Sequence, residues 1–197
     1  IKKWIHVGVI DEGRLLVSET GVGQGQIISP LLANIYLHYV LDEWFEQEVK
    51  PRLRGRAWEV RYADDFILCF QYREDAQRVL RVLHQRFARY GLSLHPEKTR
   101  LLEFGRNAQA QARRRGERKP ATFDFLGFTL YWRRTLRGGW KMWCRTRRGR
   151  LGRALQSAAE YCRRHRHDSV KEQHAALSRR IRGHYNYFGV NGNLKSL

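Results

Sequence analysis

The sequence predicts an α+β fold, with an antiparallel sheet and packed helices followed by a small helical region. Two short runs on either side of Asp64-Asp65 alternate in polarity or are rich in aromatic and β-branched residues, which predicts two strands joined by a turn. Helices are expected at residues 29–45, 74–90, 150–165 and 168–188. Hydrophobic residues make up 42% of the 197 residues, so the chain can form a folded core.

The first third of the chain is predicted to contain a hairpin, a glycine-rich loop and a buried helix. Residues 9–20 are expected to form a short hairpin around Glu12-Gly13. The glycine-rich loop 21–26 precedes Ser29-Pro30, a pair that favours a helix start with the serine as N-cap. Apolar residues lie on nearly all sides of the following segment, so this helix should be deeply buried, and Pro51 should end it.

A second helix and irregular structure are predicted after the Asp-Asp hairpin. The helix over 74–90 should end at Gly91, since glycine suits a C-terminal cap. Residues 92–104 should return to extended structure. Residues 105–120 contain many Arg, Ala and Gln residues and little apolar content, so we expect a mobile loop or insertion.

The last part of the chain is predicted to contain strands, a basic linker and two helices. Residues 122–132 should form a strand, and Gly138-Gly139 marks a turn into a further extended segment. Residues 145–153 indicate a basic linker. In the final helix Asp168 could act as the cap, and four side chains would share one face: Leu177, Ile181, Tyr185 and Phe188.

The formal net charge of +19 is concentrated in the second half of the chain. Residues 104–153 carry 15 Lys and Arg against 2 Asp and Glu, whereas residues 1–103 are nearly neutral. Such a concentration is typical of a surface that contacts a polyanion. A solvated basic face is the alternative, but most of these cations are Arg, which suits bidentate phosphate binding.

Membrane segments and cysteine motifs are not indicated by the sequence. No apolar stretch is long enough to span a bilayer and no signal peptide heads the chain, so no membrane partner is expected. Cys69, Cys144 and Cys162 are far apart, which argues against a disulfide framework and a zinc site. We therefore expect a reducing compartment, the cytoplasm.

Asp64 and Asp65 are the strongest candidates for chemistry. Acids at a hairpin tip beside a core are costly unless they are solvated, paired or bound to metal. Mg²⁺ prefers oxygen ligands of this kind and often shares them with substrate phosphates. Two solvated turn residues are the simplest alternative. An unrelated metal phosphoesterase is disfavoured, because no histidine or further carboxylate cluster accompanies the pair.

The segment Tyr62-Ala63-Asp64-Asp65 resembles the Tyr-x-Asp-Asp box of reverse transcriptases. Three residues depart from the family pattern, since Gly23 stands where proline is usual, Gln26 where glycine is common and His184 where tryptophan is usual. Four other segments, in the expected order along the chain, resemble boxes of the group II intron-encoded branch of that family: 21–30, 91–99, 125–128 and 181–188.

This resemblance implies a fold, an activity and partners. Residues 1–145 would form a partial polymerase palm with a basic loop at 105–120, and residues 146–197 a helical thumb or maturase (domain X)-like region. The implied activity is RNA-directed DNA polymerisation by two-metal nucleotidyl transfer, with Mg²⁺ or Mn²⁺ as cofactor. The implied partners are an RNA template, a DNA primer, dNTP and intron RNA, and the implied setting is a bacterial cell.

The resemblance also implies a role for individual residues. Asp64 and Asp65 would be catalytic and bind the metal ions. Nucleotide or template binding would involve Tyr62, Ala63, Gln24, Gly25 and Lys98. The primer grip would be formed by Phe125, Leu126 and Gly127. RNA would be bound by Arg145, Arg147, Arg148, Arg182 and Tyr185.

The family's palm holds its metals with three Asp, and the first of these is not evident in this sequence. Asp11 and Glu12 are predicted to lie in a polar turn too near the glycine loop, so we expect the first Asp to precede Ile1 and the isolated chain to polymerise poorly. Two alternatives stay open. One is a splicing maturase that binds RNA without polymerase activity. The other is a reverse transcriptase of a retron, a diversity-generating element or a CRISPR locus.

Overall fold

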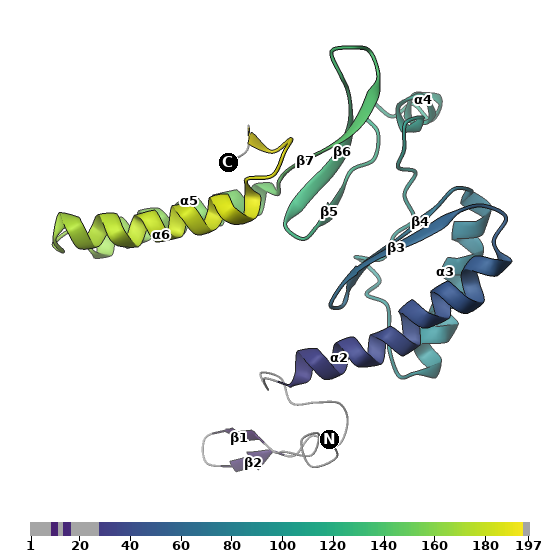
Figure 1. The fold of residues 1–197 in the computed structure, drawn as a ribbon, viewed down its shortest axis with the longest axis horizontal. Helices are drawn as coiled ribbons and strands as arrows, with labels where there is room; N and C mark the ends of the chain where they lie inside the picture. Colours follow the sequence, from purple (N-terminus) through teal and green to yellow (C-terminus); the bar gives the residue numbers. More distant parts are fainter. Residues whose placement is uncertain (1–8, 12–13, 17–27, 195–197) are drawn as a thin grey trace. The chain divides into compact units, whose positions relative to one another are not determined.

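The computed structural model describes residues 9–11, 14–16 and 28–194, and the chain divides into two compact units, residues 1–101 and 102–197. Helices alternate with small sheets in both units, and every strand pair in the described residues is antiparallel (Figure 1). The predicted α+β class with antiparallel sheets is therefore confirmed. The predicted glycine-rich loop at 21–26 lies outside the described residues.

The first unit begins with the predicted hairpin, in which β1 (Val9–Asp11) pairs with β2 (Arg14–Leu16). Helix α2 (Ser29–Leu37) starts where the Ser-Pro pair predicts it. The N-cap is Ile28 rather than Ser29, because Ser29 already lies in the first helical turn with Pro30. This correction moves the cap by one residue and leaves the helix start in place.

Helix α2 continues into an irregular helical run. Two π-helical segments, η1 (His38–Asp42) and η2 (Phe45–Val49), lead to the 3₁₀ turn η3 (Lys50–Arg52). The chain then becomes extended at Leu53, so the run ends just after Pro51, as predicted. π-Helical turns are rare and are frequent at functional sites, so this segment is of interest below.

The prediction that this whole helical run is deeply buried is wrong for its first half. In the described residues α2 has no buried side chain, and Leu31 is 59% exposed. The second half is the core of the unit, with Val40, Leu41 and Phe45 almost fully buried. Apolar residues on all sides therefore do not ensure burial, because the hydrophobic core of the unit includes only residues of the second half.

The Asp-Asp hairpin forms as predicted. Strand β3 (Ala57–Tyr62) pairs with β4 (Asp65–Phe70), and Tyr62 lies opposite Asp65. Helix α3 (Arg73–Arg89) follows, and Gly91 adopts a positive φ of 67°, which suits the predicted cap. Three side chains of α3 enter the same core as the irregular helix: Val79, Leu83 and Phe87.

The segment after α3 differs from its prediction. Residues 92–104 contain no strand, and a short turn lies at 96–98. The predicted mobile loop at 105–120 contains helix α4 (Ala108–Arg114), with Ala108 and Ala112 buried. The alanines explain the difference, since they favour helix and are small enough to bury without a large apolar side chain.

The second unit contains a three-stranded antiparallel sheet in the order β5-β6-β7. The single strand predicted at 122–132 is two strands, β5 (Phe123–Phe125) and β6 (Phe128–Arg134), separated by a two-residue turn. Strand β7 (Trp140–Thr146) follows the predicted Gly138-Gly139 turn.

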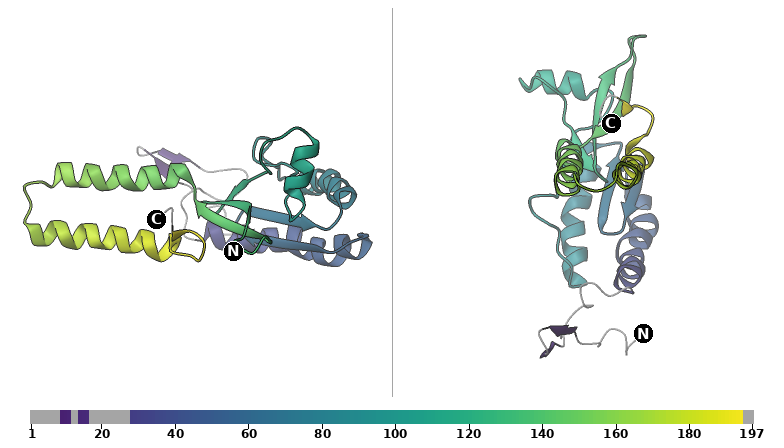
Figure 2. Two further views of the ribbon diagram at one scale, coloured as in Figure 1. Left: turned by 90° about the horizontal axis from the view of Figure 1, so that it is seen from above. Right: turned by 90° about the vertical axis from the view of Figure 1, so that its left-hand side faces the viewer.

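Two long helices complete the second unit. Helices α5 (Arg148–Arg164) and α6 (Val170–Phe188) lie side by side and antiparallel (Figure 2). The predicted basic linker at 145–153 is wrong, because β7 runs to Thr146 and α5 begins two residues later. None of the described helices is both long enough and apolar enough to cross a membrane.

The start of α6 also differs from prediction. Ser169, not Asp168, caps the helix through a capping box with Glu172. Asp168 instead lies 2.7 Å from Nδ1 of His165. Leu177, Ile181, Tyr185 and Phe188 were predicted to share one face of this helix; Phe188 is buried, whereas Ile181 and Tyr185 are about half exposed, because this pair of helices leaves much of its surface to solvent.

Candidate functional site

The turn between β3 and β4 consists of Ala63 and Asp64, since Tyr62 and Asp65 form the last strand pair. Ala63 adopts a positive φ of 53°, which is uncommon for a residue other than glycine. The side chains of Asp64 and Asp65 are exposed. Within the described part of the chain neither carboxylate takes part in an ion pair or a hydrogen bond. Both are therefore available to a cation.

The two faces of this hairpin have different surroundings. Because side chains alternate along a strand, Ala57, Glu59 and Arg61 share the face that turns towards the helices. The other face carries Trp58 and Tyr62, which are more than half exposed. The hairpin thus presents an exposed aromatic ring directly beside the acidic turn.

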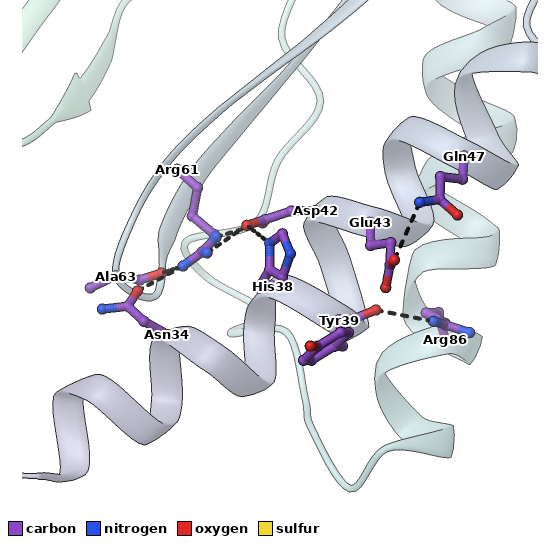
Figure 3. A network of polar contacts seen from close by, with 9 residues as sticks. All are labelled: Asn34, His38, Tyr39, Asp42, Glu43, Gln47, Arg61, Ala63 and Arg86. Atoms are coloured by element: carbon purple, nitrogen blue, oxygen red, sulfur yellow. Dashed lines mark hydrogen bonds and ion pairs between the residues drawn. The ribbon is translucent and has the colours of Figure 1, made fainter.

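A polar network lies under the turn on the inner face (Figure 3). The guanidinium of Arg61 donates two hydrogen bonds of 2.6 Å to the carboxylate of Asp42, from Nε and from Nη2. Its Nη1 atom donates at 2.9 Å to the side-chain oxygen of Asn34 and at 2.9 Å to the backbone oxygen of Ala63. One side chain therefore joins α2, the π-helical turn and the acidic turn.

Two carboxyl groups beside Arg61 have opposite protonation behaviour. Burial would raise the pKa of Asp42, but the hydrogen bonds and charge of Arg61 outweigh it and hold that pKa below its ordinary value. Burial, together with the negative charge of Asp42, raises the pKa of Glu59 to about 7. Oε1 of Glu59 is buried and has no hydrogen-bond partner in the described residues.

The chemistry of Asp64 and Asp65 fits a hard divalent cation. Exposed carboxylate oxygens without a cationic partner are suitable ligands for Mg²⁺ or Mn²⁺. In the described ranges no cluster of three or more His, Cys, Asp or Glu side chains has the arrangement of a metal site. These two acids can thus supply part of a coordination shell, and water or substrate oxygens would supply the rest.

The other residues predicted to bind nucleotide or template have varied positions. Tyr62 and Ala63 belong to the acidic hairpin. Lys98 lies in the same unit, in the exposed turn at 96–98, where its backbone N–H donates to the carbonyl oxygen of His95. Gln24 and Gly25 lie outside the described residues.

The predicted primer grip forms a second strained turn, in the second unit. Phe125 pairs with Phe128, and the two residues between them, Leu126 and Gly127, have φ values of 49° and 81°. Positive φ at both central positions is typical of a tight two-residue hairpin. The end of α6 packs on this turn, since Tyr187 donates a hydrogen bond of 2.9 Å to the carbonyl oxygen of Leu126.

The predicted RNA-binding residues lie at two places in the second unit. Arg145 of β7 stacks over Tyr131, and Arg147 forms an ion pair of 2.9 Å with Asp124. Arg148 is exposed in the first turn of α5. On α6, an open hollow is lined by Ser178, Ile181, Arg182, Tyr185 and Asn186. Arg147 is thus already paired with Asp124, whereas Arg148 and Arg182 are available to bind a ligand.

Comparison with known proteins identifies the family. Residues 1–130 match the sequence profile of the family described as reverse transcriptase (RNA-dependent DNA polymerase). This chain belongs to the reverse transcriptase family. The matched residues of this reverse transcriptase include the acidic hairpin and the turn at Leu126-Gly127, and they end before α5 and α6.

A curated relative comes from Schizosaccharomyces pombe and is described as an uncharacterized 91 kDa protein in cob intron. It is 48% identical to this reverse transcriptase over 46 residues, which are 23% of this chain and 6% of the relative. The chain therefore matches only a small part of that relative's length.

Sequence reasoning did not find the residues under the acidic turn. Arg61, Asp42 and Asn34 come from three elements and meet only in the folded unit. One signal was available in the sequence. Glu59 and Arg61 alternate with large apolar residues, so their charged side chains lie on the same face of the strand as Ala57. Charges on an inward face need partners.

Proposed function

We propose that this chain is part of a group II intron-encoded reverse transcriptase that extends a DNA primer on an RNA template. The observation that carries the proposal is the pair of exposed, unpaired carboxylates at the turn of an antiparallel hairpin, within the residues that match the family. Asp64 and Asp65 are the protein ligands that hold Mg²⁺ in this proposal, and Mn²⁺ can replace it.

Each residue of the hairpin turn has its own role in this proposal. Asp64 and Asp65 provide oxygen ligands, and when bound, the metal ions stabilise the attacking and leaving oxygens of the transferred phosphate. The exposed ring of Tyr62 provides a stacking surface for a nucleotide beside the acids. Ala63 has only a methyl side chain, which leaves space for substrate above the turn.

The second unit supplies contacts to the primer and to RNA in this proposal. The turn at Leu126-Gly127 presents backbone groups to the primer. Tyr187 of α6 holds this turn through its hydrogen bond to the carbonyl oxygen of Leu126. Exposed Arg148 and Arg182 attract phosphates, and Tyr185 beside Arg182 can stack on a base. Intron RNA is the proposed ligand of α5 and α6.

A splicing role without DNA synthesis is the second candidate. It is favoured by the relative described as a protein in an intron and by the basic helices α5 and α6. A retron or CRISPR-associated reverse transcriptase is a further alternative within the same family. The three free thiols, Cys69, Cys144 and Cys162, support the additional proposal of a reducing location such as the bacterial cytoplasm.

The test is primer extension by the natural full-length protein on poly-rA with an oligo-dT primer and Mg²⁺ or Mn²⁺. Asp64→Asn should lower the rate at least about 100-fold, because it removes a charged ligand from the site. Glu48→Gln is the matched control, since Glu48 is an exposed acid of the same unit without a polar partner among the described residues. Synthesis that survives Asp64→Asn would refute the proposal.

The same variant separates the two candidate functions. If Asp64→Asn abolishes DNA synthesis and leaves intron splicing unchanged, the protein has both activities and the acids serve only polymerisation. If the wild-type protein assists splicing and shows no DNA synthesis under any of these conditions, the splicing role stands alone.

A further inference from the structure

The acidic turn is held in an uncommon backbone conformation. Ala63 has a φ of 53°, and residues other than glycine adopt this conformation only when their surroundings fix it. The carbonyl oxygen of Ala63 accepts a hydrogen bond of 2.9 Å from Nη1 of Arg61. Asp64 follows directly, so the position of its carboxylate depends on this contact.

Arg61 is itself fixed by two helical elements. Asp42 accepts from Nε and Nη2, each at 2.6 Å, which sets both the position and the plane of the guanidinium. Asn34 of α2 accepts from Nη1, the atom that also contacts Ala63. The side chain of Arg61 is only 14% exposed, so solvent screens these contacts weakly.

The π-helical turn that carries Asp42 is also supported from the other side. Arg86 of α3 donates to the carbonyl oxygen of Val40 at 3.2 Å. It also donates to that of Tyr39 at 3.4 Å (Figure 3). Its guanidinium lies over the rings of Trp44 and Tyr90. A continuous set of contacts thus leads from α3 through the π-helical turn and Arg61 to the acidic turn.

We propose that Arg61 is a positioning residue that holds the Ala63-Asp64 turn in the geometry required of the metal ligands, and that Asp42 holds Arg61 in place. The inference rests on the proposed function, because it assigns a purpose to the site formed by Asp64 and Asp65. Arg61 does not touch substrate in this scheme. It acts through the backbone of Ala63.

The competing explanation is that the ion pair between Arg61 and Asp42 only stabilises the fold. Three variants distinguish this explanation from a positioning role. Arg61→Lys keeps the charge but loses the planar fork, and Lys cannot contact Asp42 at two points and Ala63 together. Asp42→Asn removes the charge that orients the fork. Asn34→Ala removes one hydrogen bond to Arg61 and leaves the ion pair intact. It can therefore test the inference even if the other two variants do not fold.

The matched control is Arg81→Lys, since Arg81 is an exposed residue of α3 that pairs with none of the residues the structure describes. All variants are made in the natural full-length protein. Amide hydrogen exchange at residues 62–66 should become at least about 10-fold faster in Arg61→Lys and Asp42→Asn, and smaller increases should follow Asn34→Ala. Exchange within α3 should change less than about twofold. The control should match the wild type in both segments.

Primer extension with Mn²⁺ gives the second measurement. Loss of positioning should lower kcat about 10- to 100-fold, leave KM for the primer–template within about threefold, and raise the Mn²⁺ concentration for half-maximal rate. Unchanged exchange at the turn would overturn the inference. A loss of kcat that follows the loss of melting temperature equally in every variant would overturn it too.

Failure of the proposed function has a different outcome. In that case the wild-type protein does not extend primers, and Asp64→Asn has no effect. The exchange measurement needs no activity, and it still decides whether Arg61 and Asp42 fix the turn.

Discussion

Tyr187 donates a hydrogen bond of 2.9 Å from its hydroxyl group to the backbone oxygen of Leu126, although 61 residues separate the two. Leu126 and Ala63 are the two residues other than glycine with positive φ in the described chain. Each lies in a hairpin turn within the residues that match the family, and the carbonyl of each accepts a side-chain hydrogen bond. Both turns are therefore strained turns held by one specific side-chain donor.

The Tyr187 contact can be removed with little change in packing. Tyr187→Phe keeps the ring, which stacks on Phe128, and deletes only the hydroxyl donor. We expect a loss of about 1 kcal/mol in the free energy of unfolding, measured by urea denaturation. Tyr185→Phe makes the same chemical change where the hydroxyl has no hydrogen-bond partner in the described part of the chain, and its stability should be unchanged within error. Equal losses in the two variants would contradict the role of this hydrogen bond.

A side chain at Gly127 in the same turn is expected to destabilise the protein. It has a φ of 81°, and a methyl group added there would lie 3.4 Å from the ring of Phe188. Gly127→Ala should therefore destabilise the protein by about 1–2 kcal/mol in urea denaturation.

Gly149 in the first part of α5 gives the opposite control. A methyl group there would meet no neighbour among the described residues, and its backbone is helical. Gly149→Ala should raise stability by about 0.5–1 kcal/mol, because alanine favours helix more than glycine does. If Gly127→Ala also stabilised the protein, the turn could not have the positive φ described here.

Glu59 should make stability depend on pH between its unfolded and folded pKa. Burial and the charge of Asp42 raise its pKa to about 7 from an ordinary value of 4.5, and Glu46 acts in the same direction while Arg61 opposes it. The folded protein then binds the proton more tightly than the unfolded chain. The contribution of Glu59 is thus most favourable below pH 4.5 and is lost as the pH rises through about 7.

Glu59→Gln removes this dependence because glutamine does not titrate. Relative to wild type, the variant should gain about 1–2 kcal/mol in unfolding free energy between pH 5 and pH 8, after allowance for solvent screening. Glu48→Gln, at an exposed acid of the same unit, should show no such gain. Parallel stability curves for wild type and Glu59→Gln over this range would show that Glu59 is not protonated in the folded protein.

Local patterns predicted much of the fold. Alternation around Asp64-Asp65 placed β3 and β4, and helical spacing of Val79, Leu83 and Phe87 placed α3 within a residue of its observed start. These elements were predicted because alternation and helical spacing are properties of neighbouring residues alone. The acidic turn was found for the same reason, since both its strands and its acids are contiguous in sequence.

Features that depend on distant partners were not predicted. The π-helical turn at 38–42 is stabilised by Arg86, which lies more than forty residues later. Asp42 meets Arg61 across 19 residues, and Tyr187 meets Leu126 across 61. The start of α6 is a different case, because the spacing of Ser169 and Glu172 is a capping box visible in the sequence, and the choice of Asp168 as the cap overlooked it.

The hollow on α6 gives a prediction about RNA binding that separates charge from stacking. Arg182 and Tyr185 are one helical turn apart and both line it. If Arg182 contacts a phosphate, Arg182→Gln should weaken RNA binding and reduce the slope of log K against log salt by about 0.7–0.9. Tyr185→Leu should weaken binding by about 1–3 kcal/mol and leave that slope unchanged, because base stacking releases no counterions. Fluorescence anisotropy over a series of salt concentrations measures both quantities, and a slope that changes equally in the two variants would rule out this division of roles.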